Sequence, residues 1–319
     1  MASKFYVKQV SFAQSLWYNE TTVFDPYVQP HEKKRVVNMK HRSATLLLLL
    51  LVLCLLMPVW AFSEAAGDTV DILFLGTSDV HGQLYATNYT TDVSQSGQYA
   101  RGLTRVATYV KEQRAQYENV FLGDCGDLVQ GTPLTYYYAF YQPDVQDPAM
   151  KALRMMDYDL FVTGNHEYNY GMDILSRQLA DLTAPPAEGE DEVWVSMADY
   201  LDAATNSDEA RDWAAWNGYD PYRVFDYGGV KVAVMGIGNP NVSKWDVPEN
   251  WEGICFAGVI DTYLHYEEEM DAASDLIVLY SHSGIDTDIE SDFIRRLIGQ
   301  TDTIDQNPSE RFGGPQPSE

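Results

Sequence analysis

Four short polar clusters in this sequence combine the side chains that bind divalent metal ions. Asp, Asn and His offer the oxygen and nitrogen atoms that such cations prefer, and a glycine lies in or beside each cluster. The clusters are Asp79-Val80-His81, Gly123-Asp124-Cys125-Gly126-Asp127, Gly164-Asn165-His166-Glu167 and Ser281-His282-Ser283-Gly284. In an extended segment, side chains two residues apart point the same way, so Asp79 and His81 can reach one ion. The residue types therefore predict metal-assisted chemistry.

One cluster alone is weak evidence, because an Asp-x-His segment is commonly a surface loop and an Asn-His pair commonly a capped turn. Here each cluster follows a short apolar run of strand length. The runs lie at 70–75, 120–122, 160–162 and 276–280, and a further buried strand is expected at 230–237. Since binding residues concentrate in loops at strand ends, four clusters in that position indicate one shared site.

Helical spacing of apolar residues separates most of these strands. We expect helices at about 102–117, 150–156, 172–182, 259–273 and 288–298, with an inserted acidic helix at 206–216. Strands that alternate with helices predict an α/β domain in which helices pack on the faces of a sheet.

The clusters and their neighbours resemble, in chain order, the sequence blocks of calcineurin-like metallophosphoesterases. The matching segments are Thr77-Ser78-Asp79-Val80-His81-Gly82, Gly126-Asp127-Leu128-Val129-Gln130-Gly131-Thr132-Pro133, Gly164-Asn165-His166-Glu167-Tyr168-Asn169-Tyr170-Gly171 and Ser281-His282-Ser283-Gly284-Ile285. Segments 239–241 and 248–253 also look like the branch that holds 5′-nucleotidases and 2′,3′-cyclic-nucleotide phosphodiesterases. The resemblance covers about 70–305. It implies a two-sheet α/β/β/α sandwich of the metallophosphoesterase type, with the metal site at the carboxyl ends of the central strands.

The resemblance also implies a binuclear metal site with a role for each ligand. Asp79 and His81 would bind the first ion, and Asn165 and His282 would bind the second. Asp127 would bridge both. Two divalent ions would clamp a phosphoryl group and lower the pKa of a bound water that attacks in line. The sequence does not distinguish among Zn, Mn, Fe and Mg.

His166 is the residue that the resemblance places beside the phosphate, where it would stabilise developing charge or protonate the leaving oxygen. Asp124 and Glu167 are supporting residues, and bracing a loop as a hydrogen-bond acceptor is favoured for each over direct catalysis. Some relatives have an acidic residue where Asn169 stands, so Asn169 is expected to orient His166 without ionising. The aromatic run 136–141 is expected to be a half-buried helix face, with stacking on a nucleobase as the alternative.

The composition favours a folded protein with a small phosphorylated substrate. The chain has 319 residues, 45% of them hydrophobic, so it can form a packed core. Its formal net charge of −26 makes polymeric nucleic acid a poor partner, whereas bound cations can reverse the field locally for a nucleotide or another phosphoester. The 3 cysteines are too few for a disulfide scaffold. Whether Cys125 and Cys255 pair stays open, as does the oligomeric state.

The amino-terminal region has the pattern of a secretory signal peptide. Basic residues at 40–42 precede an unbroken apolar run from Leu46 to Met57, and a stretch of small residues follows. A membrane-spanning helix is the alternative, but it needs about 20 apolar residues. We therefore expect residues 39–63 to be a signal peptide that is cleaved after Ser63, and residues 1–38 to be a mis-assigned extension. The protein would be exported to the extracellular space, the cell surface or the periplasm, with membrane contact only through this signal.

The end of the sequence departs from the family pattern. Family members carry a further Gly-His-x-His block, which gives one ligand to each metal, shortly after the segment that matches 294–305. Here residues 306–319 are polar and rich in Pro and Gly, which is incompatible with a core strand. We therefore expect a truncated catalytic domain at 64–305, a sandwich incomplete at its carboxyl end, and an off-pattern polar tail at 306–319.

Together these observations predict a metal-dependent phosphoester hydrolase that acts on nucleotides, of the 5′-nucleotidase or 2′,3′-cyclic-nucleotide phosphodiesterase type. Because two expected ligands are missing, weak or absent activity is expected for this chain. One alternative is a secreted, non-catalytic acidic binding protein with the same fold, which metal content would distinguish. Another is the same enzyme class acting on other phosphoesters or on sugar-nucleotide diphosphates.

Overall fold

The computed structural model describes residues 69–86, 101–186, 191–203, 213, 219–284 and 297. The described residues from Val70 onward belong to one compact unit. The predicted extension, signal peptide and tail lie outside the described residues, as do the helices predicted at 206–216 and 288–298 apart from Trp213 and Leu297. No helix in the described part of the chain is long and apolar enough to span a membrane.

One sheet has four parallel strands whose carboxyl ends lie at the same edge. Its order is β1 (Ile72–Thr77), β2 (Asn119–Asp124), β3 (Leu160–Val162) and β4 (Trp194–Ser196). Parallel neighbours need crossover connections, which contain α2 (Leu103–Arg114), α4 (Pro148–Met155) and α5 (Met172–Leu182). The strands are mostly apolar along their whole length, as expected for a sheet that is buried on both faces.

The second sheet has three strands, in the order β6 (Tyr222–Tyr227), β7 (Val230–Ile237) and β9 (Leu276–Ser281). β6 and β7 form a hairpin, and Gly228 and Gly229 at its tip both have positive φ, as a two-residue hairpin turn requires. β7 and β9 are parallel and are joined through α7 (Val259–Ala273). A short antiparallel pair, β5 (Tyr200–Asp202) and β8 (Ile254–Phe256), lies apart from both sheets.

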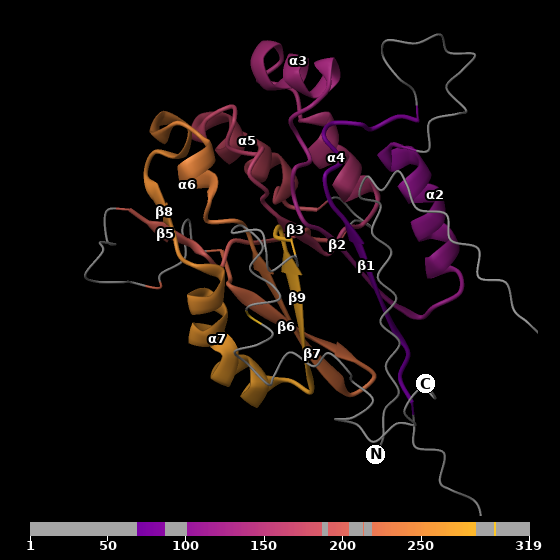
Figure 1. Ribbon diagram of the computed structural model, residues 1–319. Helices are drawn as coiled ribbons and strands as arrows, with labels where there is room; N and C mark the ends of the chain where they lie inside the picture. Colours follow the sequence, from indigo (N-terminus) through magenta and orange to yellow (C-terminus); the bar gives the residue numbers. More distant parts are fainter. Residues whose placement is uncertain are drawn as a thin grey trace, which may run out of the picture. The chain divides into compact units, whose positions relative to one another are not determined.

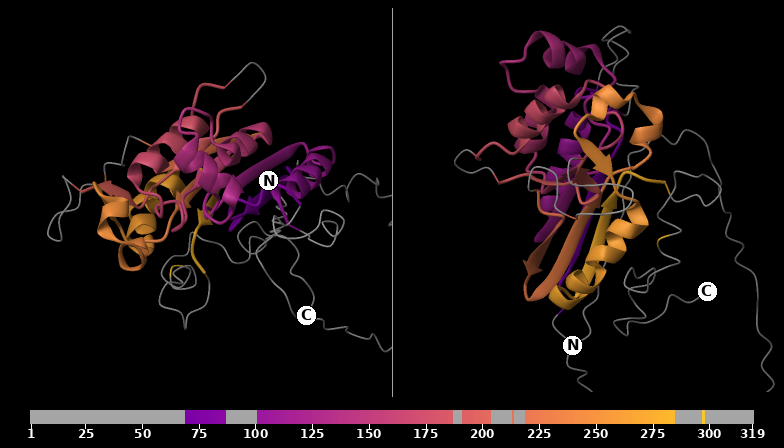
Figure 2. Two further views of the ribbon diagram at one scale, coloured as in Figure 1. Left: turned by 90° about the horizontal axis from the view of Figure 1, so that it is seen from above. Right: turned by 90° about the vertical axis from the view of Figure 1, so that its left-hand side faces the viewer.

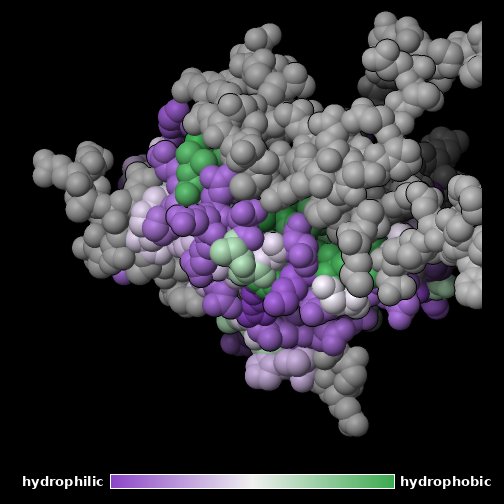
Figure 3. Space-filling view, turned by 90° about the horizontal axis from the view of Figure 1, so that it is seen from below, coloured by the Kyte–Doolittle hydropathy of each residue, from purple (hydrophilic) through white to green (hydrophobic). Residues whose placement is uncertain are grey.

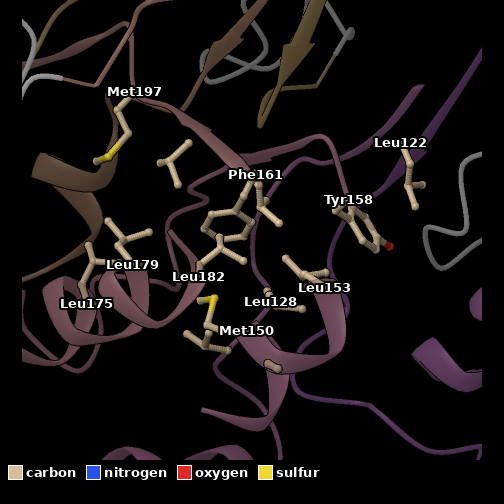
Figure 4. Packing of buried hydrophobic residues seen from close by; sticks show 14 of the residues in the cluster. Leu122, Leu128, Met150, Leu153, Tyr158, Phe161, Leu175, Leu179, Leu182 and Met197 are labelled. Carbon is tan, nitrogen blue, oxygen red and sulfur yellow. The ribbon is translucent and has the colours of Figure 1, made fainter. Parts of the chain in front are cut away.

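Three apolar clusters hold these elements together in four layers. One cluster lies between the two sheets and includes Phe74, Phe121, Val232 and Tyr280. A second packs the outer face of the four-stranded sheet on α4 and α5, whose side chains gather around Phe161 (Figure 4). A third packs the three-stranded sheet on α7. The order helix, sheet, sheet, helix can be followed in Figure 1 and Figure 2, and it confirms the predicted α/β/β/α sandwich.

On the face seen from below, the coloured residues are largely hydrophilic (Figure 3). α3 (Pro133–Tyr141) exposes apolar rings instead. Its buried residues are only Thr135 and Ala139. Four aromatic side chains on it are each at least 44% exposed, namely Tyr136, Tyr137, Phe140 and Tyr141. Three of the four rings are 44–49% exposed and so about half buried, as expected for this helix face, and Tyr136 and Phe140 contact the ring of Tyr170. Tyr141, at 65%, is more exposed than expected.

Candidate metal centre

The four polar clusters meet at the carboxyl ends of β1, β2, β3 and β9. The register of β1 and β2 sets their last residues opposite one another, so the loops that follow start at the same level. Backbone hydrogen bonds join these loops, since the amide of Asp79 donates to Gly126 at 3.0 Å and that of His81 to Asp127 at 2.8 Å. The amide of His282, directly after β9, donates to the last carbonyl of β7 at 3.0 Å.

Two groups of side-chain donor atoms converge here, and one carboxylate belongs to both. His81, Asp127 and His166 form one group, and Asp79, Asp127 and His282 form the other. Within each group the donor atoms lie within 4.8 Å of one another. Asp127 is buried, with 3% of its surface exposed. Carboxylate and imidazole donors at this spacing fit a divalent cation, and a shared carboxylate fits a pair of them.

All five predicted ligands lie in this place. Asp79 Oδ1 and His81 Nε2 are 3.9 Å apart, as expected for a pair on one ion. Asn165 lies beside His282, with 3.1 Å between Asn165 Oδ1 and His282 Nε2. His166 lies beside His81, with 5.2 Å between the ring centres.

Both candidate histidine ligands are held through Nδ1 by backbone carbonyls. His282 Nδ1 donates to the carbonyl oxygen of Cys125 at 2.6 Å, and His81 Nδ1 donates to that of Gln130 at 3.0 Å. Such contacts fix the tautomer and leave Nε2 as the ligand atom, an arrangement common behind metal-bound histidines. Burial disfavours the charged form of His282, but the hydrogen bond and charge of Asp127 raise its pKa to about 9. A cation would compete with this proton.

The loops that carry these side chains contain strained backbone. Asp79, His81 and Asp127 have φ values of 54°, 51° and 57°, a left-handed conformation that residues other than glycine rarely adopt. Gly126 has φ 89°, and a Cβ atom there would lie 2.1 Å from the backbone nitrogen of Gly164. The two loops therefore pack backbone against backbone, which only glycine permits at this point.

Two buried carboxylates hold the loops together without joining either donor group. Glu167 accepts hydrogen bonds at 2.7–3.2 Å from four backbone amides, those of Gly164, Asp127, Leu128 and Val129. Asp124 accepts from Thr77 Oγ1 at 2.5 Å and from the amide of Gly126 at 2.9 Å. Burial raises the pKa of Asp124 to about 7. These contacts connect the loops after β1, β2 and β3.

His166 lies at the edge of the site, where its side chain is 36% exposed. Its backbone amide donates to Asp127 Oδ1 at 2.8 Å, and its Nε2 lies 3.9 Å from Asp127 Oδ2. On the far side of the ring, Nδ1 lies 2.6 Å from Asn169 Oδ1. The ring therefore turns Nε2 toward Asp127, while Nδ1 is hydrogen-bonded to Asn169.

A sequence model described as calcineurin-like phosphoesterase matches residues 72–305. The chain belongs to this family. The trifunctional nucleotide phosphoesterase protein YfkN of Bacillus subtilis is 27% identical over 278 residues, which are 81% of this chain and 17% of that protein. A 2′,3′-cyclic-nucleotide 2′-phosphodiesterase/3′-nucleotidase of Salmonella typhimurium is 30% identical over 233 residues, which are 69% of this chain and 33% of that protein.

Solved structures of family members share the sandwich. The crystal structure of the calcineurin-like phosphoesterase YfkN from Bacillus subtilis has a TM-score of 0.57 at 26% identity, covering 73% of this chain and 69% of that chain. A putative 5′-nucleotidase from Staphylococcus aureus has a TM-score of 0.60 at 24% identity, covering 73% and 43%, and supports the fold alone. This chain spans a third or less of the length of the two curated relatives above, so their full activities are only a proposal for it.

One acidic residue beside this family's metal centre has no signal in the sequence. Asp246 directly follows α6 (Val242–Trp245) and accepts a hydrogen bond from Asn169 Nδ2 at 2.9 Å. The two residues are 77 positions apart, and no spacing rule connects them. The nearest hint is that Asp246 precedes segment 248–253, which resembles the nucleotidase branch.

Cys125 and Cys255 do not form a disulfide with each other in the described structure, so the pairing that the sequence left open does not occur. Burial raises the pKa of Cys125, which keeps its sulfur protonated. Cys125 serves the site through its backbone carbonyl, which holds His282.

Proposed function

We propose that this chain is the phosphoester-cleaving part of a hydrolase that acts on nucleotides with two divalent metal ions. The observation that carries the proposal is Asp127, a buried carboxylate shared by two groups of metal-binding side chains. Two ions held in this way would supply a metal-bound water of lowered pKa and would neutralise the charge that develops on a phosphoryl group. The relatives are named as nucleotide phosphoesterases and nucleotidases, which supports a nucleotide as the substrate.

The distances and the family resemblance together support an assignment of the ligands. Asp127 takes the bridging position, and the family resemblance pairs Asp79 with His81 and Asn165 with His282, whose donor atoms lie 3.9 Å and 3.1 Å apart. The donor groups cross these pairs, since Asp79 converges with His282 and His81 with His166, and Asp127 is common to both groups. In both histidines Nδ1 is taken by a backbone carbonyl, so Nε2 is the atom that remains for the metal. In Asn165 only Oδ1 can serve, because an amide nitrogen has no free lone pair for a cation.

His166 is the group that would meet the substrate. Its Nε2 faces the donor groups and its ring is partly exposed, so a phosphate can reach it from solvent. From this position a protonated His166 would donate Nε2–H to a phosphoryl oxygen or to the leaving oxygen. Asp124 and Glu167, in contrast, are fully buried and would act only through the loops that they hold.

The test combines metal content with turnover, using the full chain. Elemental analysis should find about two ions per chain, and should also identify which metal the protein acquires. Asp127→Asn should weaken the binding of both ions, whereas His282→Ala should weaken mainly one. A metal content unchanged in Asp127→Asn would refute the bridging assignment.

Turnover then separates the remaining alternatives. At most weak hydrolysis of AMP and 2′,3′-cyclic AMP is expected in the presence of Mn²⁺ or Zn²⁺, with p-nitrophenyl phosphate as a substrate that lacks a nucleoside. Metal binding without hydrolysis of any of them would favour a non-catalytic binding protein of the same fold. Hydrolysis of p-nitrophenyl phosphate alone would favour another phosphoester as the substrate.

We also propose that the protein is exported and that its catalytic domain starts after the signal. The support is the order of basic, apolar and small residues at 39–63, together with the family match that begins at residue 72. Mass spectrometry of secreted material should find a mature protein that starts near Glu64. Recovery of a cytoplasmic protein with residues 1–63 intact would reject export.

A further inference from the structure

Asp246 connects the loop after β7 to the proposed catalytic histidine. Its Oδ2 accepts a hydrogen bond from Asn169 Nδ2 at 2.9 Å. Its Oδ1 accepts two others, from Asn250 Nδ2 and from the amide of Val247, both at 2.8 Å. Asn169 in turn faces His166, with 2.6 Å between Oδ1 and Nδ1. We propose that Asp246 is a positioning residue that sets the tautomer and orientation of His166 through Asn169.

The direction of each hydrogen bond in this chain follows from the carboxylate at its end. A carboxylate only accepts, so the amide group of Asn169 must turn Nδ2 toward Asp246. Its carbonyl oxygen Oδ1 then points to His166 and also only accepts, so His166 Nδ1 must carry a hydrogen. In a neutral ring the Nε2 lone pair therefore faces the donor groups, and in a charged ring Nε2–H does.

Asp246 itself is held firmly enough to impose this direction. It follows α6, whose Val242 is buried in the core cluster beneath the four-stranded sheet. Two donors fix Oδ1, one from its own chain neighbour Val247 and one from Asn250 in the next turn. Oδ2 remains for Asn169, and because a carboxylate oxygen only accepts, the amide of Asn169 must turn its nitrogen toward it.

Asn169 cannot select an orientation alone. An amide has an oxygen and a nitrogen of nearly equal size, and rotation by 180° exchanges a donor for an acceptor. A rotated Asn169 would donate Nδ2–H to His166 Nδ1, which would move the ring hydrogen to Nε2. The carboxylate of Asp246 excludes this state, because Asn169 Oδ1 would then face Asp246 Oδ2, and two acceptors form no hydrogen bond.

The isosteric change Asp246→Asn makes a sharp prediction. The new amide at position 246 would keep its oxygen toward Val247 N and Asn250 Nδ2, which both donate, and would turn its nitrogen toward Asn169. Asn169 would then rotate, and His166 would change to the tautomer with hydrogen on Nε2. The double variant Asn169→Asp with Asp246→Asn reverses the pair: the new carboxylate at position 169 accepts from both neighbours, and the original tautomer returns.

Nuclear magnetic resonance of the full chain with ¹⁵N-labelled histidine tests this without any need for turnover. The chain has 6 histidines, and His166→Gln identifies the signals of His166. Long-range ¹H–¹⁵N spectra, recorded where the ring is neutral, should show Nδ1–H in the natural chain, Nε2–H in Asp246→Asn and Nδ1–H again in the double variant. As a control, Asp226→Ala removes a carboxylate that accepts the amide of Gly229 in the distant β6–β7 hairpin, and it should leave His166 unchanged.

The inference about catalysis rests on the proposed function, and kinetics test that part separately. Asp246→Asn should lower kcat roughly 10- to 100-fold, the usual effect of losing a group that orients a reacting side chain, with KM changed far less, and the double variant should recover most of it. A natural chain with Nε2–H on His166, or an unchanged tautomer in Asp246→Asn, would overturn the proposal. A natural chain that shows the expected tautomers but hydrolyses nothing would refute the proposed function and leave the positioning role intact.

Discussion

Glu167 offers the clearest way to separate the framework of the metal centre from its ligands. Its two carboxylate oxygens divide four backbone amides between them. Oε1 accepts from Leu128 at 2.7 Å and from Val129 at 3.2 Å, and Oε2 accepts from Asp127 and Gly164 at 2.7 Å each. Burial raises the pKa of Glu167, but because all four partners donate, only the ionised carboxylate satisfies every one of them.

Glu167→Gln keeps the size of the side chain and replaces one of these oxygens with an amide nitrogen. Whichever way the new amide turns, two backbone amides lose their acceptor and face a donor instead. An unsatisfied buried donor costs about 1–3 kcal/mol, so the free energy of unfolding should fall by about 2–6 kcal/mol. The loops at 127–129 and 164 would also separate, which should weaken metal binding although no ligand has changed.

Urea unfolding of the full chain gives the first number, and metal titration gives the second. Glu268→Gln is the matched control, because Glu268 lies exposed on α7 and its replacement should change stability by less than about 0.5 kcal/mol. If Glu167→Gln lowered the free energy of unfolding by less than about 1 kcal/mol, the four hydrogen bonds would contribute less to stability than their burial implies. The bracing argument would then be wrong.

Three further substitutions test other features of the fold. Gly126→Ala should destabilise the chain by about 2–6 kcal/mol in urea unfolding, since it combines a left-handed φ with a Cβ atom 2.1 Å from a backbone nitrogen; a stable variant would refute the close packing of the two loops. Asp199→Asn should stabilise the protein at pH 8 by roughly 1–4 kcal/mol and have little effect at pH 4. Burial raises the pKa of Asp199 to about 7, and its Oδ2 has no hydrogen-bond partner among the described residues, so the natural chain should lose stability as the pH rises from about 4 to about 7; equal pH profiles of natural chain and variant would contradict this. Tyr136→Ala should change the free energy of unfolding by less than about 1 kcal/mol because the ring is 46% exposed. A larger loss would show that the ring contributes mainly to the packing of α3. A raised KM for AMP with an unchanged KM for ribose 5-phosphate would indicate that the ring stacks on the base.

The sequence predicts the central strands because their physical signal is local. A strand such as Ile72–Thr77 is apolar on both faces and stops where glycine and polar residues begin, so its existence and its end are both visible in the sequence. The site follows from the same signal, since polar clusters placed after parallel strands must meet at one edge. β4, β5 and β8 have three residues each, too short for any periodicity to appear, and none of them is predicted. β3 is equally short, but its three apolar residues stand directly before a polar cluster, which makes it visible in the sequence.

The remaining features depend on contacts between distant parts of the chain. Asp246 reaches Asn169 only because the loop after β7 folds over the loop after β3, and a sequence does not show which loops will meet. The aromatic residues of α3 show a second limit. A tyrosine has an apolar ring and a polar hydroxyl, so its presence on a helix does not tell whether a neighbouring element covers it. The sequence indicates a half-buried face there, and three of the rings are 44–49% exposed, but it does not single out Tyr141, which is 65% exposed.

Charge connects the braces, the ligands and the substrate in one argument. The carboxylates of Asp79, Asp124, Asp127 and Glu167 lie at adjacent strand ends of a chain with a net charge of −26. Burial raises the pKa of Asp124 and of Glu167, and the charge of Glu167 on Asp124 and of Asp127 on Glu167 acts in the same direction. Backbone amides offset this for Asp124 and Glu167, which face inward. The negative charge that is left, on Asp79 and Asp127, faces the donor histidines, where divalent cations would neutralise it. An acidic surface repels phosphate everywhere else, so a small phosphoester would be attracted only to the place where those cations are held.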